Sequence, residues 1–195
     1  MLHPPEDAIR RLESRLSSER FRHSVGVYET CVLLADAWKN YPVDRDWLMW
    51  AALFHDCGKE LSGAQTEELL NDEPLRWGAE LMEFKKLRHA PLGAKLLQME
   101  YGVENDDVLK AVAYHPTGSP ELTPIGWMVY IADYLEPNRS GFEDREMMLE
   151  QACADPMKGL RLMADLRIQV VKKKGKTVHP LAVEFRKYLK LLGKP

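Results

Sequence analysis

Apolar side chains recur every three to four positions along nearly the whole chain of 195 residues, which is the spacing of one buried helix face. No stretch alternates apolar and polar residues in the manner of a half-buried strand. This periodicity restricts the fold more than any other feature, because a helical pattern cannot place its apolar residues on one face of a sheet. We therefore expect an all-α protein, a helical bundle whose amphipathic helices share one core.

Start and stop signals divide this pattern into ten expected helices. Asn105 is a capping side chain at a helix start, and Thr123-Pro124 and Asp155-Pro156 each combine a capping side chain with a first-turn proline. Gly102 stands where helix ends favour glycine, and Gly78 interrupts one of the expected helices. The expected ranges are 5–17, 21–38, 46–54, 65–71, 74–86, 91–101, 106–114, 124–136, 156–174 and 181–192.

The charge balance limits the classes of partner. Lys and Arg number 27 against 30 Asp and Glu, so the formal net charge of -3 provides no overall positive field for nucleic acid or an anionic membrane. A chain of this length buries roughly 70% of its unfolded surface, and it can therefore form a core without disulfides or a structural metal. We expect a single domain over residues 1–195, with neither nucleic acid nor membrane as a partner.

The cysteines and the N-terminus indicate a reducing compartment. Cys31, Cys57 and Cys153 are odd in number and lack C-x-x-C spacing, which fits neither a disulfide framework nor a thiolate zinc site. The first residues carry acids and arginines where a signal peptide needs an apolar segment.

The longest apolar run, Trp47 to Phe54, is far shorter than the ~20 residues of a membrane helix and predicts a buried helix. We expect a cytoplasmic protein.

Histidine and aspartate residues form the second informative pattern. His23, the adjacent pair His55-Asp56, His89, His115 and Asp133 follow one another at intervals of about 18 to 33 residues. Such intervals are too long for one helix face, but they suit ligands that successive helices deliver to the core of a bundle. Three of these elements border apolar helical segments, where a charged carboxylate is costly unless it is paired or bound to a metal.

Each of these residues also has an ordinary structural interpretation. A single histidine beside apolar residues is more often a hydrogen-bonded core or cap residue than a metal ligand, and Asp133 alone could pair with an arginine. The combined pattern favours a metal site in the core of the bundle. His3 and His179 lie outside the pattern, and we expect them at the surface or in loops.

The donor types indicate which metals such a site would hold. Imidazole and carboxylate donors without thiolate suit iron, manganese or cobalt and make a closed structural zinc site a poor fit. The two oxygens of Asp56 allow it to bridge two metals, whereas His55 can bind only one. Two metals that share a hydroxide form a hydrolytic site for phosphate esters and anhydrides.

Five motifs resemble those of one protein family. The order of His23, His55-Asp56 and Asp133 resembles the HD-domain metal-dependent phosphohydrolase superfamily, whose fold is all-α. Within that superfamily the chain looks like the YqeK family of symmetrical bis(5'-nucleosyl)-tetraphosphatases over about residues 15–190. The motifs are RxxHSxGV at 20–27, AxxFHDxxK at 51–59, LxHAPxGA at 87–94, YHxTG at 114–118 and IADYxEPxR at 131–139.

The resemblance implies an enzyme that hydrolyses diadenosine tetraphosphate at its middle anhydride to two ADP molecules. It also implies iron in a dinuclear centre, with manganese or cobalt as alternatives. Among the implied ligands, His23 and Asp133 would also line the substrate site. The family pattern assigns His23, His55, Asp56 and Asp133 to the principal metal, and His89 and His115 to the second metal or to phosphate contacts.

Catalytic roles for Asp56, Lys59 and Arg139 follow from the same resemblance. A metal-bound hydroxide would attack a central phosphorus while Lys59 and Arg139 neutralise phosphate charge. Both cations have structural alternatives: Lys59 could stabilise its helix end, and Arg139 could pair with Glu136 or Glu143. The expected substrate-binding residues are His23, Lys59, His89, His115, Thr117, Asp133, Arg139 and, in the late loop, Lys176, Thr177, Val178 and His179.

Two positions depart from the family pattern. Cys57-Gly58 stands where the family has variants such as HDYAK, and Pro116 stands where threonine is more frequent. Pro116 removes a backbone N–H beside the expected phosphate site, and a buried, inert thiol is the favoured interpretation of Cys57. Neither departure affects an expected metal ligand.

Two other functions stay open for this sequence. One is hydrolysis of a different nucleotide, such as a dNTP, a monophosphate or an alarmone, at the same site. The other is a nucleotide or metal sensor without turnover, against which the intact ligand set argues. A homodimer also stays open, because the spacing of the five tryptophans and nine methionines does not distinguish a dimer face from the core.

Overall fold

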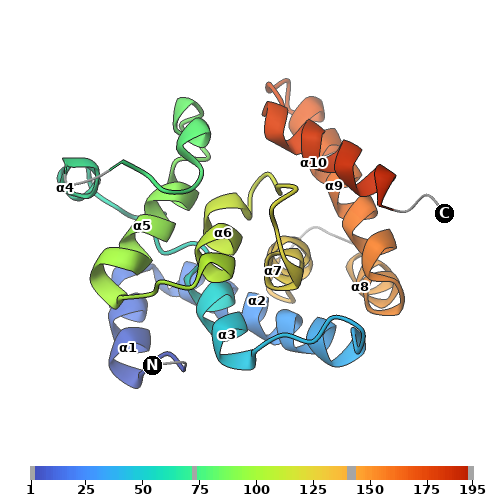
Figure 1. Ribbon diagram of the computed structural model, residues 1–195, viewed down its shortest axis with the longest axis horizontal. Coiled ribbons are helices and arrows are strands. Elements are labelled where there is room, and N and C mark those ends of the chain that lie inside the picture. Colours follow the sequence, from blue (N-terminus) through green and yellow to red (C-terminus); the bar gives the residue numbers. More distant parts are fainter. Residues whose placement is uncertain (1–2, 72–73, 140–143, 193–195) are drawn as a thin grey trace.

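The computed structural model describes residues 3–71, 74–139 and 144–192, and it consists of helices joined by short connections (Figure 1). The described residues include no β-strand, which confirms the all-α class. The helices are α1 (Glu6–Arg15), α2 (Ser18–Ala37), α3 (Arg45–Phe54), α4 (Gly63–Asn71), the 3-10 helix η1 (Ala79–Glu83), α5 (His89–Tyr101), α6 (Asp106–Tyr114), α7 (Pro124–Leu135), α8 (Arg145–Ala154), α9 (Pro156–Lys173) and α10 (Pro180–Leu191).

Capping residues set several of these boundaries as the sequence predicts. Asn105 accepts a hydrogen bond from the Val108 amide at 3.1 Å, and Asp155 accepts one from the Lys158 amide at 3.0 Å. Thr123 occupies the N-cap position of α7, but its side chain makes no capping hydrogen bond, so Pro124 is the effective start signal there.

The predicted helices differ from the structure at two segments, 74–86 and 145–154. The helix predicted over 74–86 is reduced to the short η1 segment, because Gly78 has a φ of 72° and ends any helical path at that point. Helix α8 was not predicted. In the structure, Asp144 makes no capping hydrogen bond at the start of α8, and Ala152 is the one residue of this helix that is fully buried. The segment therefore has neither the start signal nor the continuous apolar face that reveal the other helices.

Helix α7 lies at the centre of the fold. It is in contact with α2, α3, α6, α8 and α9, and most of its side chains, including Met128 and Tyr130, are buried. The pair α5 and α6 packs on one side of this centre, and the pair α9 and α10 packs on the other, as Figure 1 shows. Because α2 and α7 are adjacent in space, residues more than 100 positions apart meet in the core.

The turn after α3 packs tightly against α5. A Cβ atom on Gly58 would lie 2.8 Å from the Gly93 amide nitrogen and even closer to the His89 carbonyl oxygen. In this structure only glycine allows this approach. Cys57 is fully buried beside it, and burial raises the pKa of its thiol, so the favoured interpretation as an inert core cysteine agrees with its environment.

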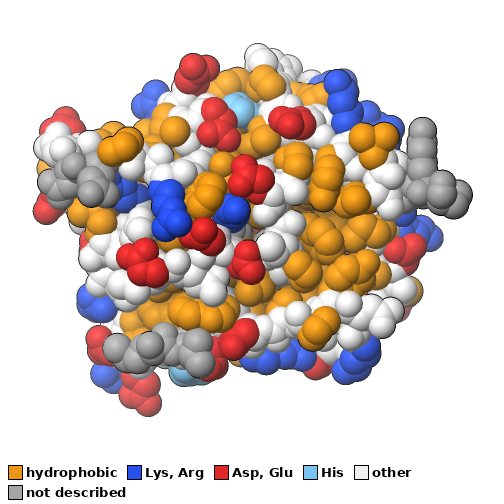
Figure 2. Space-filling model, viewed as in Figure 1, with side chains coloured by type: hydrophobic (Ala, Val, Ile, Leu, Met, Phe, Trp, Pro, Cys, Tyr) orange, Lys and Arg blue, Asp and Glu red, His pale blue; other side chains and the backbone are white. Residues whose placement is uncertain are grey.

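The apolar run from Trp47 to Phe54 lies within α3, and its residues from Trp50 onward are buried as predicted. In the described part of the chain, no helix combines the length and apolar character needed to cross a membrane. Figure 2 shows acidic and basic side chains interspersed over one face of the molecule, with apolar side chains gathered where α7, α8 and α9 lie in Figure 1.

Candidate metal centre and active site

Three of the candidate histidines are held by the same local contact. His55 and His115 follow the last turns of α3 and α6, and His89 begins α5. In each ring Nδ1 meets the carbonyl oxygen of the residue three positions earlier, at 2.7, 2.8 and 3.0 Å for His55, His115 and His89. A carbonyl oxygen only accepts hydrogen bonds, so Nδ1 carries the proton and Nε2 keeps a free lone pair.

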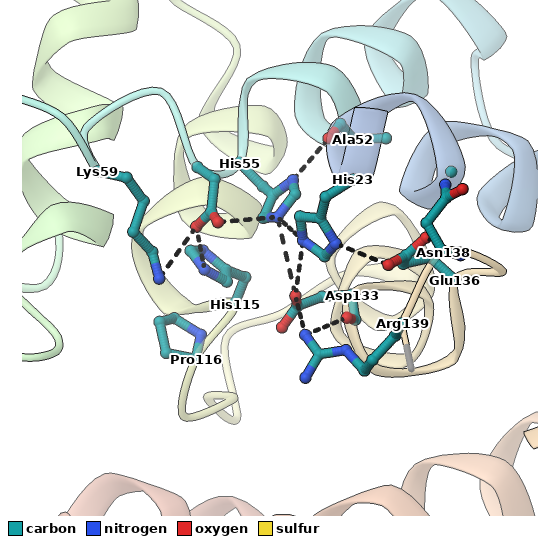
Figure 3. A network of polar contacts seen from close by, with 12 residues as sticks. His23, Ala52, His55, Lys59, His115, Pro116, Asp133, Glu136, Asn138 and Arg139 are labelled. Carbon is teal, nitrogen blue, oxygen red and sulfur yellow. Dashed lines mark hydrogen bonds and ion pairs between the residues drawn. The ribbon is translucent and has the colours of Figure 1, made fainter. Parts of the chain in front are cut away.

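The fourth histidine, His23 on α2, is held by a carboxylate instead. Its Nδ1 lies 3.1 Å from Oε1 of Glu136, a residue that is only 2% exposed. The carboxylate accepts the Nδ1 proton, so His23 has the same tautomer as the other three rings. Figure 3 shows Glu136 on one side of His23, with His55 and Asp133 on the other.

The four rings turn their Nε2 atoms toward one another in two pairs. The Nε2 atoms of His23 and His55 are 3.2 Å apart, and those of His89 and His115 are 3.3 Å apart. With both protons on Nδ1, neither pair can form a hydrogen bond, and the facing lone pairs repel each other. A cation between them removes this repulsion, so each pair has the arrangement of metal ligands.

Asp56 lies between the two pairs. Its Oδ2 is 3.8 Å from His55 Nε2, whereas its Oδ1 is 3.3 Å from Nε2 of both His89 and His115. Oδ1 is buried and has no hydrogen-bond partner among the described residues, which is costly for a carboxylate oxygen. One oxygen therefore faces each histidine pair, and this is the geometry of a carboxylate that can bridge two ions.

Asp133 completes the ligand set around the first pair. Its Oδ1 lies 3.2 Å from His23 Nε2 and 3.9 Å from His55 Nε2. All six expected ligands thus meet in one place, delivered by α2, α5, α7 and the ends of α3 and α6. Two ligand groups result: His23, His55, Asp56 and Asp133 form the first, and Asp56, His89 and His115 form the second.

Burial and neighbouring charges shift the pKa values of several of these groups. Burial lowers the pKa of His115 to about 4, so this ring is neutral at neutral pH. Burial opposes ionisation of Asp56, but the nearby His55, His115 and His89 outweigh it and hold the carboxyl pKa well below its usual range. For Asp133, burial is outweighed chiefly by Arg167, with the same result. Burial also lowers the pKa of His55, whereas for His23 burial is outweighed by Asp133 and Glu136, which raise the pKa of that ring. The neutral form is thus favoured for His55 and His115, and the ionised form for both carboxylates.

Arg167 on α9 is a site residue that the sequence interpretation missed. Its Nη2 donates to Asp133 Oδ2 at 2.9 Å and to the Tyr130 carbonyl oxygen at 2.6 Å, while its Nη1 donates to the His115 carbonyl oxygen at 3.1 Å. The guanidinium also lies 4.3 Å from the centre of the Tyr130 ring. Arg167 thus leaves Oδ1 as the oxygen of Asp133 that faces the histidines.

The two expected catalytic cations lie at the same site. Lys59 Nζ is 3.6 Å from Asp56 Oδ1, and Arg139 Nη2 is 3.3 Å from Asp133 Oδ1. Arg139 pairs with Asp133 rather than with the Glu136 side chain, which is engaged by His23; Glu143 lies outside the described residues. Both cations line one polar cavity with a volume of ≈ 800 Å³, together with His23, Asp56, His89, His115 and Asp133.

A second, mostly apolar cavity adjoins the first. It has a volume of ≈ 500 Å³, and the two cavities share Lys86, Pro116 and Arg167 as lining residues. Apolar side chains such as Phe84, Leu87, Ile168 and Val171 form much of its wall. The remaining expected substrate-binding residues all line this second cavity: Thr117, Lys176, Thr177, Val178 and His179.

His179 has a structural role as well. Its Nδ1 accepts a hydrogen bond from the Leu181 amide at 3.2 Å, so it caps α10, and its ring packs against Phe84 with the ring centres 4.7 Å apart. It is nearly buried rather than at the surface. His179 therefore lies in a loop, as expected, but its ring is packed into the cavity wall instead of being exposed.

The ligand pattern and the fold together define an HD-domain protein. The model of the HD domain matches residues 20–138, and the chain belongs to this family. A solved structure from Clostridium acetobutylicum, described as a "predicted HD superfamily hydrolase involved in NAD metabolism", is similar with a TM-score of 0.85. It is 32% identical, over 97% of this chain and 99% of that one.

Curated relatives point to a particular activity within the family. Proteins from Halalkalibacterium halodurans and Bacillus subtilis, both named symmetrical bis(5'-nucleosyl)-tetraphosphatase, are each 35% identical to this chain. The first match covers 76% of both chains, and the second covers 69% of this chain and 70% of the relative.

Proposed function

We propose that this HD-domain protein is a metal-dependent symmetrical bis(5'-nucleosyl)-tetraphosphatase that hydrolyses diadenosine tetraphosphate to two ADP molecules. The relatives supply the substrate, and one structural observation supports the chemistry. This observation is the pair of facing Nε2–Nε2 contacts, 3.2 and 3.3 Å long, on either side of Asp56. It favours hydrolysis at a two-metal centre over a nucleotide-binding module without turnover.

The donor set fits two divalent ions. His23, His55, Asp56 and Asp133 would hold the first, and Asp56, His89 and His115 the second. Iron is the metal we propose, with manganese or cobalt as alternatives, because imidazole and carboxylate donors without thiolate suit all three. When bound, the ions would supply Lewis acidity toward the phosphoryl group and activate the attacking water.

The reaction forms one P–O bond and breaks another, and the attacking water loses a proton to the solvent. The water oxygen attacks one of the two central phosphorus atoms, and the bond from that phosphorus to the middle bridging oxygen breaks. The departing ADP keeps the bridging oxygen, and the attacked half leaves as the second ADP. Because the anhydride is split at its centre, the two products are the same.

Lys59 and Arg139 are placed to neutralise the phosphate charge on the two halves of the substrate. Both have part of their side chains accessible from the polar cavity, with exposures of 29% and 35%. They approach the ligand set from opposite ends, since Lys59 lies beside Asp56 and Arg139 beside Asp133. Positive groups held in place before the reaction stabilise charge that develops in the transition state.

The apolar cavity is the proposed site for one nucleoside. Its wall carries the late-loop residues Lys176, Thr177 and Val178, and Arg167 connects it to the polar cavity. A flat aromatic base suits an apolar cavity, while the phosphates suit the adjoining polar one. The proposed partner is therefore a small dinucleoside polyphosphate. The free thiols of Cys31, Cys57 and Cys153 agree with the cytoplasm as the proposed compartment.

Product analysis tests this function directly. Metal-loaded protein is incubated with diadenosine tetraphosphate, and the nucleotides are separated by chromatography. Two ADP per substrate is the expected result, whereas ATP plus AMP would rule out symmetrical cleavage. Binding without turnover would indicate a sensor. Parallel loading with iron, manganese or cobalt shows which ion supports the fastest turnover.

A further inference from the structure

Glu136 is a buried carboxylate that belongs to neither ligand group. It is 2% exposed and lies just after α7, where the chain turns away from the core. Its Oε1 accepts the Nδ1 proton of His23 at 3.1 Å, and its Oε2 accepts a hydrogen bond from the Asn138 amide at 2.6 Å. Both carboxylate oxygens are therefore engaged, and the side chain is fixed in one orientation (Figure 3).

The contact with Glu136 makes His23 different from the other three histidines. His55, His89 and His115 donate their Nδ1 protons to neutral backbone carbonyl oxygens, whereas His23 donates to a charged group. A carboxylate behind an imidazole increases the electron density at the opposite nitrogen more than a carbonyl does, and it strengthens that nitrogen as a ligand. The contact with Glu136 therefore strengthens His23 as a ligand relative to a histidine that is held by a backbone carbonyl.

The packing of α2 preserves this contact. A Cβ atom on Gly26 would lie 2.5 Å from Glu136 Oε2 and 2.8 Å from Asn138 Nδ2. Gly26 is one helical turn from His23, so α2 supplies both the histidine and the space for the carboxylate that holds it. Asn138 Nδ2 also donates to the Arg22 carbonyl oxygen at 3.3 Å, which ties the turn after α7 to α2.

The two ligand groups also differ in charge. The first contains Asp56 and Asp133, with Glu136 behind His23, whereas Asp56 is the single carboxylate among the described ligands of the second. Two cations, Arg167 and Arg139, lie beside Asp133, and Lys59 lies 3.6 Å from Asp56 Oδ1, the oxygen that faces the second group. With these cations included, the first group keeps one more net negative charge than the second. Additional nearby negative charge increases the affinity of a group for a divalent cation.

We propose that Glu136 is a positioning residue that fixes His23 and makes the group of His23, His55, Asp56 and Asp133 the tighter of two unequal metal sites. The metals would then be held in a defined order, with the ion at the second group exchanging more readily. This inference rests on the proposed metal centre but not on the identity of the nucleotide.

Graded chelation of the metal-loaded, full-length protein tests the role of Glu136. Retained metal per chain is measured after dialysis against increasing chelator concentrations. Wild-type protein should lose its metals in two steps. In Glu136→Gln, which keeps an accepting oxygen but removes the charge, the tighter metal should leave at about 10- to 100-fold lower chelator activity. The weaker step should not move, and exposed Glu13→Gln is the matched control.

A second variant tests the same contact from α2. Gly26→Ala places a methyl group against Glu136 Oε2 and should weaken the tighter site in the same direction as Glu136→Gln. Gly63→Ala on α4 is the control, because nothing lies within 4 Å of the added Cβ atom. Cobalt-loaded protein provides a spectroscopic signature: only the bands of the tighter site should change in Glu136→Gln.

The outcomes separate this inference from the proposed function. If the tighter step of Glu136→Gln coincides with that of wild type, the positioning role is wrong, although the enzyme assignment stands. If both steps weaken equally and the melting temperature falls, Glu136 is merely structural and the proposal is also wrong. If the wild-type protein retains no metal at all, the metal-dependent function itself fails.

Discussion

The two adjoining cavities of this protein contrast in their chemistry. The polar cavity is lined by carboxylates, imidazoles, Lys59 and Arg139. The second is lined largely by apolar side chains from the segment after η1, from α9 and from the loop after α9. They nevertheless share Lys86, Pro116 and Arg167. The first is suited to phosphates and metals and the second to a base, so a nucleotide can occupy both at once.

The cavities also have different origins in the chain. The polar cavity is built mainly from the segment that matches the HD-domain model, residues 20–138. The apolar cavity depends on α9 and the late loop, which lie beyond that match. We infer that the chemistry belongs to the HD core and that substrate selection depends on the C-terminal helices. The following predictions test this division, from the largest expected effect to the smallest.

The largest effect is expected for Asp56→Ala. This change removes the carboxylate that faces both histidine pairs, so neither ligand group is complete. Metal content should fall to near zero, and turnover should drop by at least about 10³-fold, since the two-metal site provides most of the charge stabilisation. Metal analysis and initial rates measure this, with exposed Asp36→Ala as control. Retention of two metals with near-normal turnover would refute the assignment of Asp56.

Lys59→Ala should separate catalysis from metal binding. The change removes one positive group from the polar cavity but no ligand, so metal content should stay at the wild-type level. We expect kcat to fall by about 10²-fold, which is typical for loss of one preorganised electrostatic contact. The exposed Lys39→Ala serves as control. Loss of metal in Lys59→Ala would instead show that Lys59 supports the fold of the site.

Val171→Asp should affect the apolar cavity alone. A carboxylate in this wall disfavours an apolar base and repels the phosphates next to it. We expect KM to rise about tenfold, a loss of about 1.4 kcal/mol in binding, with metal content unchanged. Gln169→Asp, on the exposed side of the same helix, adds the same charge as a control. An unchanged KM would place the nucleoside outside this cavity.

Gly58→Ala should have the smallest effect, which is chiefly on stability. The added methyl group meets the backbone of His89 and Gly93, and forcing α5 away should cost about 1–3 kcal/mol. The melting temperature should fall by about 2–4 °C per kcal/mol. Because His89 moves with α5, retention of the second metal should also weaken. Gly63→Ala should melt like wild type, and equal melting of both variants would contradict the tight packing.

Much of the fold could be predicted from local signals. Nine of the ten expected helices agree with the structure to within three residues at either end, because capping side chains, first-turn prolines and the helical apolar period act within a few residues. The segment 74–86 failed because Gly78 adopts a left-handed conformation that composition alone did not reveal. Helix α8 was missed because it has little apolar face.

The candidate ligands were also recognisable in the sequence, but their supporting residues were not. His and Asp residues beside apolar helical segments, together with the five motifs, indicated the six candidate ligands that the structure brings together. Glu136 is 113 residues from His23, and Arg167 is 34 residues from Asp133. Glu136 is part of the motif at 131–139, but nothing in the motif shows that it contacts His23, and Arg167 lies in no motif.

The sequence by itself determined the helical class, most helix boundaries and the candidate metal ligands, because these depend on residue type and short-range spacing. Only the tertiary structure decided which nitrogen of each imidazole faces the centre and which carboxylate stands behind His23. It also decided that α9 places Arg167 between the two cavities. These features depend on the packing of helices far apart in the chain, and a distance of a few tenths of an ångström separates a hydrogen bond from a simple contact.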